Sequence, residues 1–150
     1  MGDFVPRLKR EIAMGTTKKE EFTRVQRDSD GKYNLINANG KYLSEQWYDW
    51  IDYFYNEFAR VRREDNIYNF INKDGKIISE KWFDWVGDFH DGFAVVKNED
   101  YVYNFINKQG KLLSDEWFRR VVNFKDGLAV VYRTNGECCK IDKTGKIVSK

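Results

Sequence analysis

Residues 68–82 read YNFINKDGKIISEKW, and residues 103–117 read YNFINKQGKLLSDEW, which is nearly the same segment 35 positions later. The similarity continues beyond these segments, because residues 68–102 and 103–137 share 18 identical positions in 35 without a gap. Recurrence at a fixed step is typical of repeat proteins, in which each unit buries its apolar face against its neighbour. We therefore expect one structural unit of 35 residues to build most of the fold.

The same step extends to both ends of the chain. Residues 22–34 match residues 58–69 with one additional loop residue, so we place a repeat array at 22–150. Its full units are 33–67, 68–102 and 103–137, with partial units at both ends. Positions that recur include Tyr33, Tyr68 and Tyr103; Gly40, Gly75, Gly110 and Gly145; Trp47, Trp82 and Trp117; and Phe54, Phe89 and Phe124. We expect most of these recurring residues to be structural.

Each unit has the pattern of short β-strands joined by tight turns. Tyr68–Asn72 and Phe93–Lys97 are rich in β-branched and aromatic residues, which favour strands. The turn NKDG places glycine where a positive φ is needed, which predicts a hairpin between Tyr68–Asn72 and Lys76–Ser79. Trp82–Phe89 is predicted to be a third, less regular strand. The fold class is therefore all-β, with tandem hairpin repeats in an open solenoid-like array; a partial β-propeller is the alternative.

Residues 1–21 do not follow the repeat. Val5, Leu8 and Ile12, around Pro6, have the i, i+3, i+7 spacing of one helical face, which predicts a short amphipathic helix. Terminal units of repeat proteins need a cap, so we expect this helix to cover the first repeat.

The composition excludes several classes of protein. Aromatic residues make up 17% of the chain, and its formal net charge is only +2, so neither disorder nor strong attraction to nucleic acid is expected. No apolar run is long enough for a membrane helix, and no secretory signal is recognisable. The adjacent cysteines Cys138 and Cys139 are expected to be reduced, which favours a cytoplasmic location.

The unit resembles the WG-repeat family of bacteria and phages. The segment YNFINKDGKIISEKWFDWVGDFHDGFAVV, residues 68–96, carries the glycine-lysine turn and the later Phe-x-x-Gly-(Leu/Phe)-Ala-x-Val pattern of that family. It departs at the signature dipeptide, where Tyr-Asn stands at 33–34, 68–69 and 103–104 and Cys-Cys at 138–139. The resemblance implies an all-β interaction module without catalytic residues of its own.

Groups that carry chemistry neither recur nor cluster in the sequence. His90 is the only histidine, and the acidic positions Asp49 and Asp84 are replaced by Arg119 in the next unit. The segment DSDG at 28–31 lacks the later ligands of a calcium loop. We therefore expect no enzymatic activity, no metal site and no cofactor.

Positions that differ between repeats are the better candidates for binding. Trp50 and Trp85 are replaced by Arg120 at the same offset, and a buried core layer would tolerate that exchange poorly. Trp and Arg dominate the energetic centres of interfaces. The alternative is that the Trp side chains pack into the neighbouring unit and the Arg side chains are solvated. The candidate binding residues are Trp50, Trp85, Arg60, Arg62, Arg119 and Arg120.

Three kinds of partner fit this surface. The balanced charge favours another protein, in an accessory or structural role in a bacterium or a phage, a virion component included. A sugar or nucleotide stacked on the Trp side chains is an alternative. Single-stranded nucleic acid, held by aromatic rings and arginines, is a third and is disfavoured by the low net charge.

Overall fold

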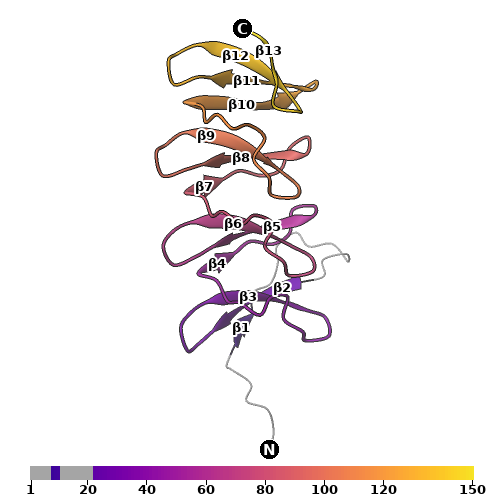
Figure 1. Cartoon of the computed structure of the whole chain (residues 1–150). Helices are drawn as coiled ribbons and strands as arrows, with labels where there is room; N and C mark the ends of the chain where they lie inside the picture. Colours follow the sequence, from indigo (N-terminus) through magenta and orange to yellow (C-terminus); the bar gives the residue numbers. More distant parts are fainter. Residues whose placement is uncertain (1–7, 11–21) are drawn as a thin grey trace, which may run out of the picture. The chain divides into compact units, whose positions relative to one another are not determined.

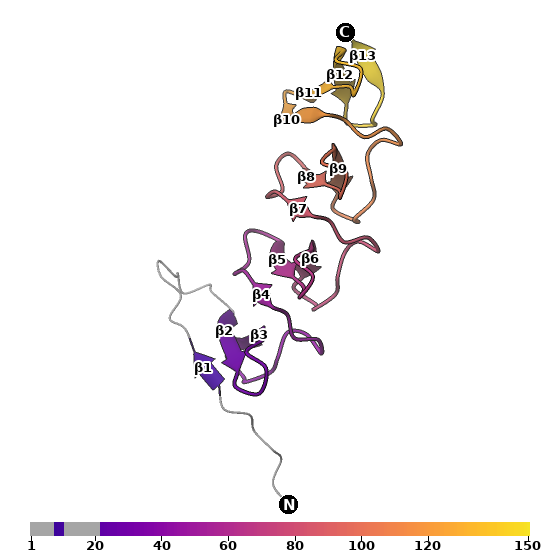
Figure 2. The ribbon, with the colours of Figure 1, turned by 90° about the vertical axis from the view of Figure 1, so that its left-hand side faces the viewer.

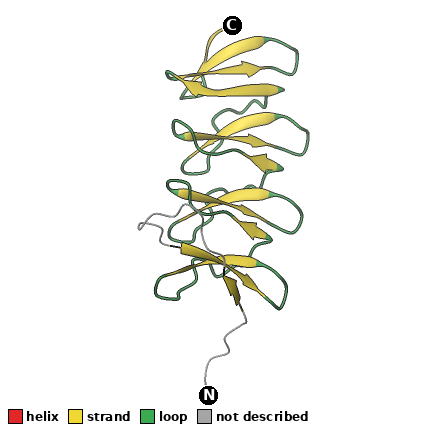
Figure 3. Cartoon of the chain, turned by 180° about the vertical axis from the view of Figure 1, so that it is seen from behind, coloured by secondary structure: helices red, strands yellow, loops and turns green. Residues whose placement is uncertain are grey.

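The computed structural model describes residues 8–10 and 22–150, and these contain β-strands, turns and loops but no helix (Figures 1 and 3). The chain divides into two compact units, residues 1–77 and 78–150. Each unit consists of separate antiparallel sheets that repeat along the chain. The prediction of an all-β fold built of repeated hairpins is therefore confirmed at this level.

The first unit holds two sheets of three strands, in the orders β1-β2-β3 and β4-β5-β6, and the second unit holds the sheets β7-β8-β9 and β10-β11-β12-β13. The strands of the first unit are β1 Leu8–Arg10, β2 Phe22–Arg27, β3 Tyr33–Asn37, β4 Trp50–Ile51, β5 Phe58–Arg62 and β6 Tyr68–Asn72. Those of the second are β7 Trp85–Val86, β8 Phe93–Lys97, β9 Tyr103–Asn107, β10 Arg120–Lys125, β11 Leu128–Tyr132, β12 Cys138–Asp142 and β13 Ile147–Ser149. Figure 2 shows the members of each sheet as neighbouring ribbons.

The main hairpin of each repeat differs from the predicted one. Strand β5 pairs with β6, and β8 with β9, from Phe93↔Asn107 to Lys97↔Tyr103. The predicted partner strand Lys76–Ser79 is reduced to a single bridge between Ile77 and Ile71. In the last repeat the same forward pairing forms a strand, β13, next to β12. Of the predicted third strand Trp82–Phe89, two residues form β7.

The turn before the segment 76–79 is closed by a side chain. The side chain of Asn72 accepts hydrogen bonds from the main-chain N–H groups of Asp74 and Lys76, at 2.9 and 3.0 Å. The turn then carries Gly75 against the backbone of Leu43 in the preceding repeat. The equivalent glycines Gly110 and Gly145 lie in the same way against Ile78 and Leu113.

The predicted N-terminal helix is wrong where it can be compared. Leu8–Arg10 form strand β1, which pairs with β2 in the register Leu8↔Arg27 to Arg10↔Val25. Strand β1 supplies the pairing to β2 that β4 supplies to β5, so it satisfies backbone groups on an otherwise unpaired side of β2. The rest of the predicted helix lies outside the described residues.

Aromatic residues from successive repeats form the core of the second unit. Phe93 of one repeat and Phe105 of the next both contact Phe124, with ring centroids 4.8 and 5.0 Å apart. The same buried cluster includes Phe118, Ala129, Val131, Cys139 and Ile141. One repeat therefore buries its rings only when a neighbour covers them, as the recurrence of these residues predicts.

A buried asparagine closes the loop in each repeat. Asn34, Asn69 and Asn104 are fully buried at the position where the family pattern has glycine. The amide nitrogen of Asn104 donates to the carbonyl oxygens of Ser114 and Glu116, at 2.8 and 3.2 Å. Its side-chain oxygen accepts from the N–H of Phe105 at 2.7 Å. These bonds hold the loop that follows β9 to Asn104, near the start of β9.

Candidate functional site

Side chains directly opposite each other on antiparallel strands lie on the same face of the sheet. The candidate residues Trp50, Trp85, Arg62 and Arg120 all belong to such cross-strand rows. The rows are Trp50–Arg62–Tyr68, Trp85–Lys97–Tyr103 and Arg120–Tyr132–Cys138. The repeat therefore presents an aromatic or cationic row at one fixed place in each of these three sheets.

Trp50 in the first unit is held by contacts within the chain. The guanidinium of Arg24 lies 4.1 Å from the centre of its ring, and the ring of Tyr33 meets it edge-on at 5.0 Å. The indole N–H donates to Asp52 at 2.7 Å. The side chain is half-buried, as expected for a residue that packs against the neighbouring sheet.

Arg24 is an internal ligand of that aromatic site. Its guanidinium also lies 4.4 Å from the ring centre of Tyr53, and its Nε donates to the carbonyl oxygen of Ile51 at 2.7 Å. Only 8% of Arg24 is exposed. Two aromatic rings and a carbonyl oxygen are thus among the groups that hold this buried guanidinium.

The two candidate arginines of β5 are also engaged locally. Arg60 forms an ion pair with Asp52 at 2.9 Å, so it supports the carboxylate that binds the Trp50 indole. Arg62 donates to the side chain of Asn66 at 3.0 Å. Both arginines are half-buried.

Trp85 in the second unit has a different environment from Trp50. It is 42% exposed, and its ring lies over Gly87, where a Cβ atom would come 3.0 Å from the ring. Gly87 occupies the offset at which Asp52 binds the indole of Trp50. Among residues 78–150, no lysine or arginine side chain lies over the ring of Trp85. The exposed part of this side chain is accessible to an external group.

Tyr101 lies beside this row in the loop between β8 and β9. It is 72% exposed and has a φ of 62°, in the left-handed region that bulky residues rarely adopt. The Nζ of Lys97 lies 5.2 Å from its ring centre. We call the four residues Trp85, Lys97, Tyr101 and Tyr103 the Trp85 surface.

Comparison between repeats shows that Tyr101 is an exception. The equivalent positions at the 35-residue step also have positive φ, and they hold Gly31, Asn66 and Gly136. Glycine and asparagine tolerate this conformation, whereas tyrosine is strained in it. The folding of this loop therefore does not explain the tyrosine.

Arg119 and Arg120 lie on the next sheet of the second unit. Both are exposed, and the guanidinium of Arg120 lies 5.3 Å from the ring centre of Tyr132. Arg120 thus covers a ring of its own row.

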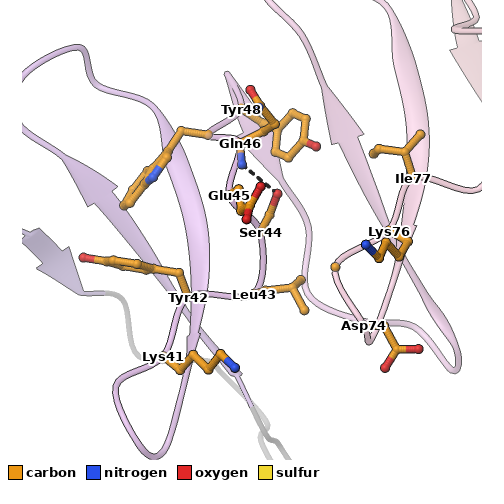
Figure 4. Close-up of a pocket in the computed structure, with 12 residues that line it drawn as sticks. Lys41, Tyr42, Leu43, Ser44, Glu45, Gln46, Tyr48, Asp74, Lys76 and Ile77 are labelled. Atoms are coloured by element: carbon orange, nitrogen blue, oxygen red, sulfur yellow. Dashed lines mark hydrogen bonds between the residues drawn. The ribbon is translucent and has the colours of Figure 1, made fainter.

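A hollow of about 630 Å³ lies in the first unit between residues 41–48 and 74–77 (Figure 4). Leu43 and Gly75 are among the residues that line it, and Tyr42 extends away from the side formed by residues 74–77. The ring of Tyr42 packs on Trp47 at 5.1 Å, and Arg27 covers Trp47 at 4.6 Å. The rings at this hollow are already in contact with groups of the chain, so we place the candidate site at the Trp85 surface.

No group of three or more metal-binding side chains is found among the residues that the structure describes. His90 lies 3.7 Å from Asp91, and both side chains are well exposed. The described residues also contain no helix long and apolar enough to cross a membrane.

The two cysteines differ in burial. Cys139 is fully buried, and burial together with its hydrogen bond to Glu137 raises the pKa of its thiol, whereas Cys138 is exposed. Because the thiolate is the reactive form, we expect iodoacetamide at pH 8 to modify Cys138 rapidly and to spare Cys139 in the folded protein. Peptide mass spectrometry measures this difference, and denaturant should abolish it. Equal labelling of both thiols in the folded protein would contradict the described packing of β12.

The sequence interpretation missed Lys97, Tyr101 and Arg24. A signal for Tyr101 was present, because its 35-residue step aligns it with Gly31 and Gly136. Lys97 and Arg24 gave no signal, since their roles depend on which rings the strand register brings beside them.

Comparisons with known proteins agree with the repeat pattern. The family model of the WG containing repeat matches residues 35–66 and 70–101. No curated protein sequence matches the chain. Similar solved structures include KlHsv2 with loop 6CD replaced by a Gly-Ser linker, at 13% identity over 86% of this chain and 48% of that one, with a TM-score of 0.47. The computationally designed Ika4 protein is 16% identical over 95% of this chain and 99% of that one, with a TM-score of 0.45.

The WD40 β-propeller domain of Doa1 is 12% identical over 88% of this chain and 51% of that one, with a TM-score of 0.42. The chain thus spans about half the length of the KlHsv2 and Doa1 chains and nearly the whole of Ika4. The recurring turns, the repeated sheets and the family match lead to one conclusion: residues 35–66 and 70–101 of this chain are WG-containing repeats.

Proposed function

We propose that this chain is a non-catalytic repeat module that binds another protein through the Trp85 surface. The observation that carries the proposal is Tyr101, a strained and exposed aromatic residue beside a second exposed aromatic residue, Trp85. A backbone conformation of this kind costs about 1–3 kcal/mol and is concentrated at functional sites. The equivalent Gly136 avoids that cost, so the tyrosine is explained by a contact outside the fold.

The chemistry of the surface supports a protein partner. Trp and Tyr supply large contact areas with few rotatable bonds, and they are enriched where interface energy is concentrated. Trp85 and Tyr101 are linked through Lys97, which is the Cα partner of Trp85 and lies over the ring of Tyr101. The three side chains therefore form one contiguous patch.

The proposal includes an open solenoid-like arrangement of the repeats, with a partial propeller as the alternative. Its support is one local contact that recurs at the repeat step: Gly75 lies against Leu43, Gly110 against Ile78 and Gly145 against Leu113. Identical contacts at identical offsets relate each repeat to the next by the same movement. Small-angle scattering would test this, since an open array is longer than a propeller segment of the same mass.

The binding proposal predicts opposite effects on stability and on association. We expect Tyr101→Gly to leave the melting temperature unchanged or to raise it, because the strain is relieved, and Trp85→Ala to change it little. Both variants should lower partner recovery at least tenfold when each is used as bait in a lysate of the source organism, quantified by mass spectrometry. A tenfold loss corresponds to about 1.4 kcal/mol.

Tyr55→Ala is the matched control, because Tyr55 is 63% exposed but lies outside the Trp85 surface. It should recover the same partners as the parent protein. Equal recovery by the Trp85→Ala and Tyr101→Gly variants would contradict the proposal.

A further inference from the structure

We infer that the hollow of the first unit binds a neutral sugar. The hollow is separate from the Trp85 surface, so this inference goes beyond the proposed function. Its volume of about 630 Å³ lies within the range of about 300–1,000 Å³ that small-molecule sites occupy. Two segments at the same place in successive repeats, residues 41–48 and 74–77, form its walls (Figure 4).

One wall of the hollow is aromatic only in this repeat. Tyr42 and Trp47 both line the hollow and are partly buried. At the 35-residue step Ile77 and Leu112 replace Tyr42, and all three residues form the same bridge to the preceding strand. An aliphatic side chain therefore satisfies the fold at this position. The ring adds a flat surface whose negative face attracts the weakly positive C–H groups of a sugar ring.

The rim of the hollow carries both signs of charge. Lys41 and Lys76 supply ammonium groups, while Glu45 and Asp74 supply carboxylates, which gives a formal charge of 2 − 2 = 0. All four side chains are exposed. Ammonium groups only donate hydrogen bonds, and carboxylates only accept them. A hydroxyl group does both, so a ligand with several hydroxyl groups is complementary to this mixed rim.

The balance of charge disfavours ionic ligands. A phosphate or sulfate group at this rim would meet two carboxylates, and a cationic group would meet two ammonium groups, so each gains attraction and repulsion together. A neutral sugar has no such repulsion. The charge balance therefore separates a sugar from a nucleotide, which would bring its phosphate groups into the hollow.

The amide of Gln46 adds a neutral donor and acceptor to the same lining. The equivalent residue in the third repeat is Glu116, which forms an ion pair with Arg133 at 3.0 Å. In that repeat the position is used for a contact within the fold. In the first repeat it holds an exposed amide beside an aromatic wall, which is the combination that sugar binding requires.

The test titrates the full chain with maltotriose, cellotriose and triacetylchitotriose as neutral sugars, and with sucrose octasulfate as an anionic one. Binding is followed through the indole N–H signal of Trp47 in ¹⁵N NMR, assigned from Trp47→Phe. We expect at least one neutral sugar to shift this signal with a dissociation constant of about 1 mM or lower. The indole signal of Trp85 should not move, and sucrose octasulfate should not shift the Trp47 signal.

Tyr42→Leu is the decisive variant, because the third repeat already accommodates leucine at this position. We expect it to weaken sugar binding at least tenfold while the urea midpoint changes little. Glu45→Gln with Asp74→Asn should weaken binding at least threefold, since each change removes a charged acceptor. Trp85→Ala is the matched control and should leave sugar binding unchanged.

Three results would overturn the inference: no shift of the Trp47 signal by any of the neutral sugars, binding that Tyr42→Leu leaves intact, or binding of sucrose octasulfate in their place. The last result would assign the hollow to an anion. Sugar binding that is lost in Trp85→Ala but kept in Tyr42→Leu would place the sugar at the Trp85 surface, against the inference. The partner-recovery experiment tests the proposed function separately, because Tyr42 lies outside the Trp85 surface.

Discussion

Replacing Gly110 with alanine should destabilise the protein far more than replacing Gly40 with alanine, although both glycines occupy the same turn of the repeat. Their φ angles are 77° and 82°, so the strain of an added Cβ is the same for both, about 1–2 kcal/mol. At Gly110 the Cβ would also overlap the carbonyl oxygen of Ile78 and lie 2.8 Å from the Cα of Ser79. At Gly40 no described atom lies within 4 Å.

The difference between the two variants isolates the contact between repeats. Overpacking against a rigid backbone costs about 1–3 kcal/mol, so we expect Gly110→Ala to lower the free energy of unfolding by about 2–5 kcal/mol in total. Gly40→Ala should lower it by about 1–2 kcal/mol. Equilibrium urea unfolding measures both values. Equal losses would show that the turn does not press on the preceding repeat.

The second large effect is expected for Asn104→Ala. The change removes the hydrogen-bond partners of the Ser114 and Glu116 carbonyl groups and of the Phe105 N–H. Leaving a buried polar group without a partner costs about 1–3 kcal/mol, so we expect a loss of about 3–5 kcal/mol in the free energy of unfolding. The same urea titration provides the measurement.

Asn135→Ala is the control for this variant. Asn135 is exposed and accepts one hydrogen bond, from the N–H of Glu137 at 2.8 Å. We expect a loss of at most about 1 kcal/mol there. If both asparagine variants unfold at the same urea concentration, the buried hydrogen bonds of Asn104 contribute no more to stability than the exposed one of Asn135.

The repeat and its turns were predictable because they depend on local rules. A glycine at positive φ and a side chain that closes its own turn act within a few residues, so NKDG and NKQG are readable without a structure. The recurrence of Phe89 and Phe124 likewise predicted a packing layer, because identical side chains at identical offsets give each repeat the same packing surface. The strand Phe93–Lys97 has the predicted bounds for the same reason.

Pairing partners were harder to predict than strands. The sequence predicted that Tyr68–Asn72 pairs forward with Lys76–Ser79, whereas it pairs back with Phe58–Arg62. Both candidates are adjacent along the chain, and the forward pairing is limited to the Ile71–Ile77 bridge here but becomes strand β13 in the last repeat. At the N-terminus, an apolar spacing that suits a helix gave way in Leu8–Arg10 to the pairing offered by β2.

The candidate site was also predictable only in part. A list of Trp50 and Trp85 at equal offsets was available from the residues alone, and so was their exchange for Arg120. Their separate environments were not, because Arg24 reaches Trp50 through space and Trp85 rests on Gly87. Local conformation and repeat length follow from interactions between near neighbours in the chain. Which ring is covered and which is exposed follows from contacts between distant residues, and those exist only after the sheets have packed.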